Sequence, residues 1–295
     1  MLDGINIDPI AFTIPIGGGF PIYWYGIIVT VGIAVGVFWA AREIARRNQN
    51  VDEFFNALIL VIFSGYVFAR LTYVLLEMFG GRGDQFKSFW DVINIRSGGI
   101  NILGGFIGAA IVGWLYIRWR RLNFWQYADV AGPALLVAQG IGRWGNFINQ
   151  ELYGPPTTLP WGILIDAPYR LAKYADMTQF PPETRFHPTF LYESIWLILG
   201  FVVLIVLNNK FRDKWKIGTL FGLFLMWWGA GRAFLEFFRP DQATIGNSPI
   251  TYSFLLALGL ALTGLYIVLS RNNRMPQIFS RRRQRVVKPK PRRES

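Results

Sequence analysis

PTFLYESIWLILGFVVLIVLNN, residues 188–209, is a 22-residue stretch whose only charged side chain is Glu193. A helix of about 20 apolar residues is long enough to cross the hydrocarbon core of a bilayer. Six further windows have the same character: 20–41, 54–78, 98–119, 124–147, 217–237 and 250–270. The sequence therefore predicts an all-α integral membrane protein with seven transmembrane helices.

The overall composition supports a membrane protein. Of the 295 residues, 53% are hydrophobic and 16% are charged, whereas soluble domains carry about 25% charged residues. The alternative is a soluble protein of several domains with buried helices, and it does not account for seven apolar windows of this length.

The basic residues orient these predicted helices. Twenty of the 30 Lys and Arg residues fall on one side of a seven-helix arrangement, in four clusters: 42–47, 118–121, 210–216 and 271–295. Because basic loops stay in the cytoplasm, we expect the N-terminus outside and the C-terminus inside. The first 26 residues have no basic residue before their apolar part, so we expect an external segment rather than a cleaved signal peptide.

We expect a membrane domain over 1–270 and a basic tail over 271–295. Residues 148–187 contain five prolines together with Leu, Tyr and Phe, which is typical of a small extracytoplasmic cap. The tail is disordered by composition. Its charge accounts for much of the net +12 and favours contact with anionic membrane lipids, at about 1 kcal/mol per basic residue, over binding to a nucleic acid.

The sequence disfavours metal and transport chemistry. It has no cysteine and one histidine, so we expect no metal site and no cofactor. No internal repeat is visible, which weakens a transporter interpretation. The spacings Gly32–Gly36 and Gly104–Gly108 predict close helix packing.

Six ionisable residues lie at predicted membrane depth, where each costs about 2.5–3.5 kcal/mol if unpaired. They are Arg70, Asp129, Arg143, Glu193, Arg232 and Glu236. Arg232 and Glu236 are four residues apart and can pair on one helix face. A single such pair could simply lock two helices together, but six charges from several helices favour an internal pocket for an anion, since Arg binds phosphate well.

A second polar cluster, GRWGNFINQELYG at 142–154, follows the predicted helix 124–147. Its glycines permit close backbone approach to a ligand. Arg143 supplies charge, Asn146 and Asn149 supply neutral hydrogen bonds, and Glu151 can orient an Arg or receive a proton. A helix-exit loop would explain Asn and Gly, but not so dense a cluster.

These residues carry a resemblance to a known family. GRWGNFINQELYG resembles the signature of the prolipoprotein diacylglyceryl transferases, and the likeness covers nearly the whole chain. The other matching segments are YWYG (23–26), ARLTYV (69–74), YADVAGP (127–133), FHPTFLYES (186–194) and GRAFLEFFRPD (231–241).

The resemblance implies a bacterial inner-membrane enzyme with seven transmembrane helices. Such an enzyme moves the diacylglyceryl group of phosphatidylglycerol to the lipobox cysteine thiol of a prolipoprotein and releases glycerol 1-phosphate. One position departs from the family pattern, because Leu103 stands where the family has the histidine of a His-Gly-Gly segment. Leucine can neither accept a proton nor bind phosphate.

We expect Arg143 and Arg232 to stabilise the charge of the departing phosphate, with Asn146 completing the cradle and Glu151 and Glu236 holding the Arg side chains. His187, the only histidine, is a candidate base or an ordinary helix-start residue; Tyr25, Asp129 and Glu151 are the other candidates. The expected substrate-binding residues are Arg143, Asn146, Asn149, Glu236, Arg239, Arg70, Asp129 and Glu193.

Three other functions remain possible from the sequence. One is an inactive or repurposed relative, since Leu103 lacks a base. A lipid or anion transporter would use the same Arg-lined pocket, and a non-catalytic membrane partner would leave the buried charges unexplained.

Overall fold

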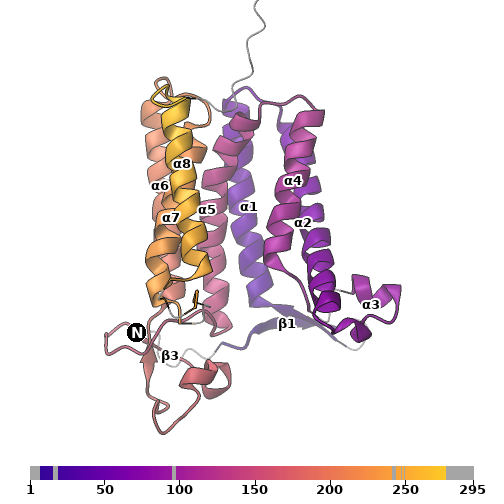
Figure 1. Cartoon of the computed structure of the whole chain (residues 1–295), viewed down its shortest axis with the longest axis vertical. Coiled ribbons are helices and arrows are strands. Elements are labelled where there is room, and N and C mark those ends of the chain that lie inside the picture. The colour runs from indigo at the N-terminus through magenta and orange to yellow at the C-terminus, as the bar shows by residue number, and fades with distance from the viewer. Residues whose placement is uncertain are drawn as a thin grey trace, which may run out of the picture.

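The computed structural model describes residues 7–15, 19–94, 98–240, 244–246, 248 and 250–276. Seven long helices make up most of these residues and lie side by side (Figure 1). Their bounds are α1 Trp24–Arg46, α2 Val51–Phe79, α4 Ile102–Trp119, α5 Phe124–Ile148, α6 Thr189–Phe211, α7 Thr219–Leu235 and α8 Tyr252–Arg271. Each begins and ends within a few residues of an apolar window of the sequence.

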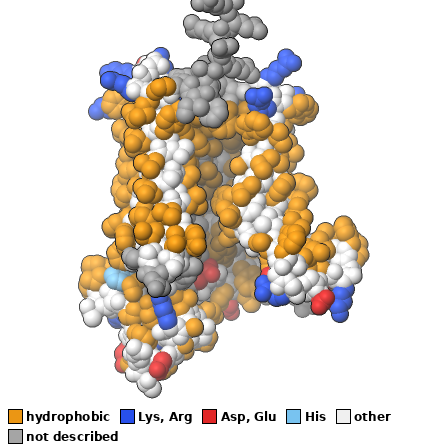
Figure 2. All heavy atoms as spheres, viewed as in Figure 1, with side chains coloured by type: hydrophobic (Ala, Val, Ile, Leu, Met, Phe, Trp, Pro, Cys, Tyr) orange, Lys and Arg blue, Asp and Glu red, His pale blue; other side chains and the backbone are white. Residues whose placement is uncertain are grey.

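Five of these helices are long and apolar enough to cross a membrane: α1, α2, α4, α6 and α8. On the face of the molecule shown in Figure 2, apolar side chains cover the middle of the bundle and most charged side chains lie at its two ends. The protein is therefore a mostly helical integral membrane protein. The other two long helices differ in character, since α7 has 17 residues and α5 carries Asp129, Pro133 and Arg143 within its length.

The helices pack in pairs where small residues allow close approach. α1 lies against α5, α2 against α4, and α7 against α8. A Cβ atom on Gly36 of α1 would come within 2.8 Å of the Ala134 carbonyl oxygen of α5, and one on Gly32 within 2.6 Å of the Ala138 oxygen. The packing expected from the Gly32–Gly36 spacing is confirmed. Gly104 and Gly108 likewise face Thr72 and Phe68 of α2.

The N-terminal segment departs from the all-α expectation. β1 (Ile10–Ile14) and β2 (Phe20–Tyr23) form an antiparallel pair that leads directly into α1. Alternating β-branched and aromatic residues favour strands. The window 20–41 predicted that the first helix begins at residue 20, but residues 20–23 belong to β2 and α1 begins at Trp24. The hairpin runs across the same end of the bundle as α3 (Phe89–Ile93) (Figure 1).

The segment between α5 and α6 forms a small compact unit at that end (Figure 1). It contains a second antiparallel pair, β3 (Ile163–Leu164) with β4 (Arg185–Phe186), and two short 3₁₀ turns, Ala167–Tyr169 and Ala172–Tyr174. Its own core gathers Tyr153, Ile163, Ile165, Tyr174 and Phe186. The expected cap region is therefore folded, although it contains strands.

The basic clusters gather at the opposite end of the bundle, where α1, α4, α6 and α8 end (Figures 1 and 2). The predicted disordered tail begins at Arg271, the last residue of α8; from residue 277 onward it lies outside the described residues.

Candidate functional site

Glu193 is the centre of a charged cluster at the start of α6. The segment between α5 and α6, which precedes it, is called the 149–188 unit below. Glu193 lies in the second turn of α6 and is 5% exposed. Its Oε2 atom is 2.5 Å from Nε of Arg143 on α5, and its Oε1 atom is 3.7 Å from an Nη of Arg239 after α7. One buried carboxylate therefore holds two guanidinium groups in place.

A second ion pair lies beside the first. Arg232 on α7 is 2.8 Å from Glu236, one helical turn away, as their spacing predicts. The Thr251 hydroxyl, at the start of α8, donates to the other oxygen of Glu236. Arg143 and Glu193 of the first pair line one cavity together with Arg232, so the two pairs belong to one cluster.

Three charged atoms in this cluster are buried without a hydrogen bond in the described part of the chain. They are Glu193 Oε2, Arg232 Nη1 and Glu236 Oε2, and each has only an ionic contact. Buried polar atoms are almost always hydrogen-bonded. A small cavity of about 30 Å³ lies among Arg143, Glu193 and Arg232, so the two ion pairs border the same space.

The turn after α5 lies next to Arg143. The Asn146 amide accepts a long, 3.4 Å hydrogen bond from Arg143 and donates to Glu151 at 2.8 Å. Asn149 also donates to Glu151. Glu151 therefore orients the two asparagines, whereas we expected it to hold an Arg; Glu193 does that instead.

This turn has a strained backbone. Gln150 and Leu152 have φ values of 52° and 56°, which non-glycine residues seldom adopt. The Thr189 hydroxyl donates to the Leu152 carbonyl and fastens the turn to α6. Strain of this kind persists only where the surrounding structure holds it, and it is common at functional sites.

Tyr25 and His187 lie at the edges of the cluster. The Tyr25 ring packs on Gly145, where a Cβ atom would come within 2.6 Å of the ring. His187 Nδ1 lies 3.1 Å from the Tyr192 hydroxyl, which accepts a hydrogen bond from the Trp161 indole. The Tyr192 proton is thus available to Nδ1, and burial lowers the pKa of His187 and favours its neutral form.

Arg70 lies apart from this cluster. It donates to the carbonyl oxygens of Asp91, Val92, Gly98 and Gly99, at 2.6–2.8 Å. These contacts hold the ends of the segment between α3 and α4 against α2. Four of the five guanidinium donors are occupied, so Arg70 has little capacity left for the substrate that we expected it to bind.

Asp129 lies at the opposite end of the bundle. It is about 21 Å from Arg143 along α5, at 1.5 Å per residue. Its carboxylate accepts the backbone N–H groups of Gly218 and Phe221, both at 2.8 Å, and contacts Arg47 at 3.3 Å. Asp129 therefore caps the start of α7 and does not share a site with Arg143.

Two polar side chains near the cluster were not among the predicted site residues. Gln139 of α5 lines the same cavity and accepts a hydrogen bond from the Trp228 indole. Tyr192 links His187 to Trp161. Gln139 could have been noticed as a lone Gln inside an apolar window. No local feature of the sequence marked Tyr192 as a polar-contact residue.

Comparison with known proteins identifies the family. The family model described as prolipoprotein diacylglyceryl transferase matches residues 9–270. Similar proteins named phosphatidylglycerol–prolipoprotein diacylglyceryl transferase occur in several bacteria. The relative from Halalkalibacterium halodurans is 39% identical over 254 residues, which cover 84% of this chain and 83% of that protein.

Two further relatives carry the same name. The one from Chloroflexus aggregans is 39% identical over 234 residues, covering 76% of this chain and 75% of the relative. One from Bacillus cereus is 35% identical over 258 residues, covering 86% and 89%.

Proposed function

The chain belongs to the prolipoprotein diacylglyceryl transferase family, and we propose that the cluster around Glu193 is its transfer site. As an enzyme of this family, it moves the diacylglyceryl group of phosphatidylglycerol to a prolipoprotein. The observation that supports this assignment is the meeting of Arg143, Arg232 and Arg239 around the buried carboxylates of Glu193 and Glu236.

In the proposed reaction the acceptor is the thiol of a lipobox cysteine. Its sulfur attacks the glycerol carbon that bears the phosphate, a C–S bond forms, and the C–O bond to the phosphate breaks. The leaving group is glycerol 1-phosphate, which gains negative charge as that bond breaks. The thiol proton leaves to solvent or to a nearby base.

Arg143 and Arg232 supply the stabilisation of that charge. Nε of Arg143 pairs with Glu193, and Nη1 donates a hydrogen bond to Asn146. The Nη2 group can therefore donate to phosphate oxygens. Preorganised cations act most strongly where water is excluded. Asn146, held by Glu151, adds a neutral contact at the rim of the same site.

The proposed thiol activation does not depend on a histidine. Leu103 is 60% exposed at the start of α4, and His187 already faces the Tyr192 hydroxyl through Nδ1. A free thiol has a pKa of about 8.5, and neighbouring Arg residues lower it. The positive cluster can therefore raise the thiolate fraction without a dedicated base.

We also propose that all seven long helices span the bacterial inner membrane, with α5 and α7 enclosed by the other five. The N-terminus and the 149–188 unit then lie outside, where secreted prolipoproteins arrive, and the basic end lies in the cytoplasm. The gathering of the basic clusters at the end opposite the 149–188 unit supports this orientation.

The test is transfer to a lipobox peptide by purified protein in phosphatidylglycerol vesicles, followed by mass spectrometry. We expect a mass gain of one diacylglyceryl group. Arg143→Ala and Arg232→Ala should each lower the rate by about 10²–10³, the usual loss when one donor to a developing oxyanion is removed.

Arg118→Ala is the matched control, because Arg118 is exposed and lies at the opposite end of the bundle. It should transfer at the parent rate. Normal turnover in Arg143→Ala or Arg232→Ala would show that the cluster is not the transfer site, and a protein with no transfer at all would contradict the activity itself.

A further inference from the structure

A second polar cavity lies at the basic end of the bundle, far from the transfer site. It has a volume of about 210 Å³ and lies among the ends of α1 and α6 and the beginnings of α5 and α7. A single water needs only about 10–15 Å³, so this cavity has room for a charged headgroup. We refer to it as the basic-end cavity.

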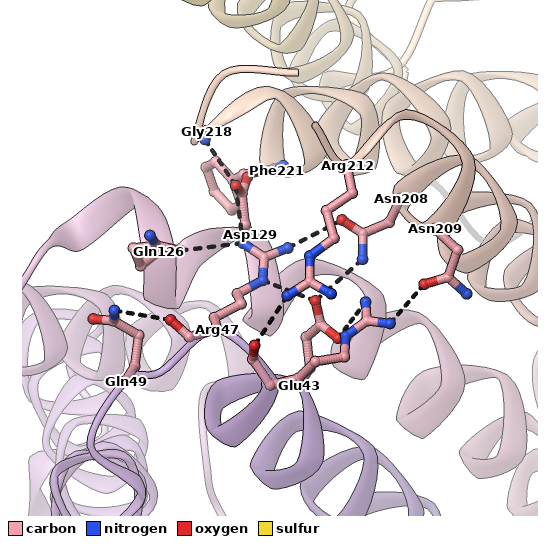
Figure 3. Close-up of polar contacts among 11 residues, drawn as sticks. Glu43, Arg47, Gln49, Gln126, Asp129, Asn208, Asn209, Arg212, Gly218 and Phe221 are labelled. Atoms are coloured by element: carbon pink, nitrogen blue, oxygen red, sulfur yellow. Dashed lines mark hydrogen bonds and ion pairs between the residues drawn. The ribbon is translucent and has the colours of Figure 1, made fainter. Parts of the chain in front are cut away.

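Arg47, at the end of α1, forms the inner wall of this cavity (Figure 3). Its side chain is 12% exposed and is held by Glu43 at 2.8 Å, Asn208 at 3.1 Å and Asp129 at 3.3 Å. Asn208 also donates to Glu43. Arg47 is therefore a fixed cation whose position is set by three helices.

The carboxylate of Asp129 does little to repel an anion in this cavity. Both of its oxygens accept backbone N–H groups at the start of α7, and one also contacts Arg47. Among the described residues that line the cavity, Asp129 is the only acid, whereas Arg47, Arg212 and Lys216 are cations. The lining therefore has a formal charge of +2.

Arg212 and Lys216 form the outer wall and are exposed. Arg212 donates one N–H group to the Arg46 carbonyl at 2.9 Å, and its side chain extends from the end of α6 toward Arg47 (Figure 3). Trp215 stacks on Phe211 beside them, and Trp is common at membrane interfaces.

We propose that the basic-end cavity binds the phosphate of an anionic lipid in the adjacent leaflet. Guanidinium groups bind phosphate through paired hydrogen bonds, and basic pockets between transmembrane helices accommodate acidic headgroups. A soluble phosphate shares this chemistry. The cavity lies where membrane helices end and beside an interfacial Trp, which favours the lipid. This inference does not depend on the proposed transfer site.

The experiment uses native mass spectrometry of the full chain in a neutral detergent, titrated with short-chain phosphatidic acid. The cavity variant is Arg212→Gln with Lys216→Gln. Its matched control is Lys210→Gln with Lys214→Gln, which removes the same charge from the same region but from residues outside the cavity lining. We expect the cavity variant to bind one phosphatidic acid molecule about 30-fold more weakly than the parent protein does.

The control pair should keep that lipid, and phosphatidylcholine should not occupy the site. Both variants should transfer at the parent rate, which also shows that they are folded. Equal losses in the two variants, or no loss in the cavity variant, would overturn the proposal. Binding of inorganic phosphate alone with the same affinity as phosphatidic acid would assign the cavity to a soluble anion and overturn the lipid assignment.

Discussion

Leu103 leaves the start of α4 without a histidine that could act as a base in the proposed transfer. Its exposed apolar side chain cannot act as a base, so activation by the Arg cluster makes a distinct prediction. The transfer rate should rise as the pH approaches the thiol pKa of about 8.5. Leu103→His should increase the transfer rate only near neutral pH. The measurement is the transfer rate from about pH 6 to about pH 9 for both proteins.

One result would contradict this mechanism. If the parent protein were inert at every pH and Leu103→His restored transfer, the base would be indispensable and the Arg cluster insufficient.

His187 makes a prediction about stability. Burial lowers its pKa from the usual 6.5, so the folded state binds a proton less readily than the unfolded state. The contribution of neutral His187 to the free energy of unfolding is complete above pH 6.5. It is lost as the pH falls through that value toward the lower pKa of the folded state. The melting temperature should therefore fall less between about pH 7.5 and about pH 5.5 in His187→Gln than in the parent.

The comparison isolates His187 because the chain has no other histidine and both proteins share every carboxylate. An identical pH dependence in the two proteins would mean that His187 titrates alike in the folded and unfolded chains.

At the scale of elements, Asp129 joins α5 to the start of α7. Asp129→Ala removes an N-cap contact, which costs about 1–2 kcal/mol, and also removes a partner of the buried Arg47, which adds to the loss. We expect a lower melting temperature but a normal transfer rate per folded molecule. Asp129→Asn keeps an oxygen for the cap and should be destabilised less.

The same two variants test the role in substrate binding that the sequence suggested for Asp129. A stable Asp129→Asn protein that had lost transfer would place Asp129 in the reaction, despite its distance from Arg143 along α5.

For the whole molecule, the proposed orientation can be tested directly because the chain has no cysteine. Gln179 and Lys214 are exposed and belong to opposite ends, in the 149–188 unit and in the loop after α6. In intact cells a membrane-impermeant maleimide should label Gln179→Cys and should label Lys214→Cys only after permeabilisation. The parent chain is the unlabelled control.

The reverse labelling pattern would place the basic end outside the cell. It would also make the proposed delivery of secreted prolipoproteins to the Glu193 cluster impossible.

The helices and one ion pair of the proposed transfer site could be predicted from the sequence. Apolar windows predict helix positions within a few residues because every membrane helix must satisfy its backbone internally and cover itself with apolar side chains. The Arg232–Glu236 pair was equally predictable, since residues four apart on a helix are neighbours. The N-terminal hairpin was not, because β1 is too short to form an apolar window and β2 is apolar enough to be taken for the start of the first helix.

Which charges meet depends on how the helices pack. Arg143 and Glu193 lie on different helices, and no local rule pairs them; their contact at 2.5 Å follows from the packing of α5 against α6. Arg70 and Asp129 were grouped with Arg143 in the sequence because a buried charge has the same cost wherever it is placed, although the structure places both apart from the Glu193 cluster. Their partners, four backbone carbonyls and the start of α7, become neighbours only when the chain folds.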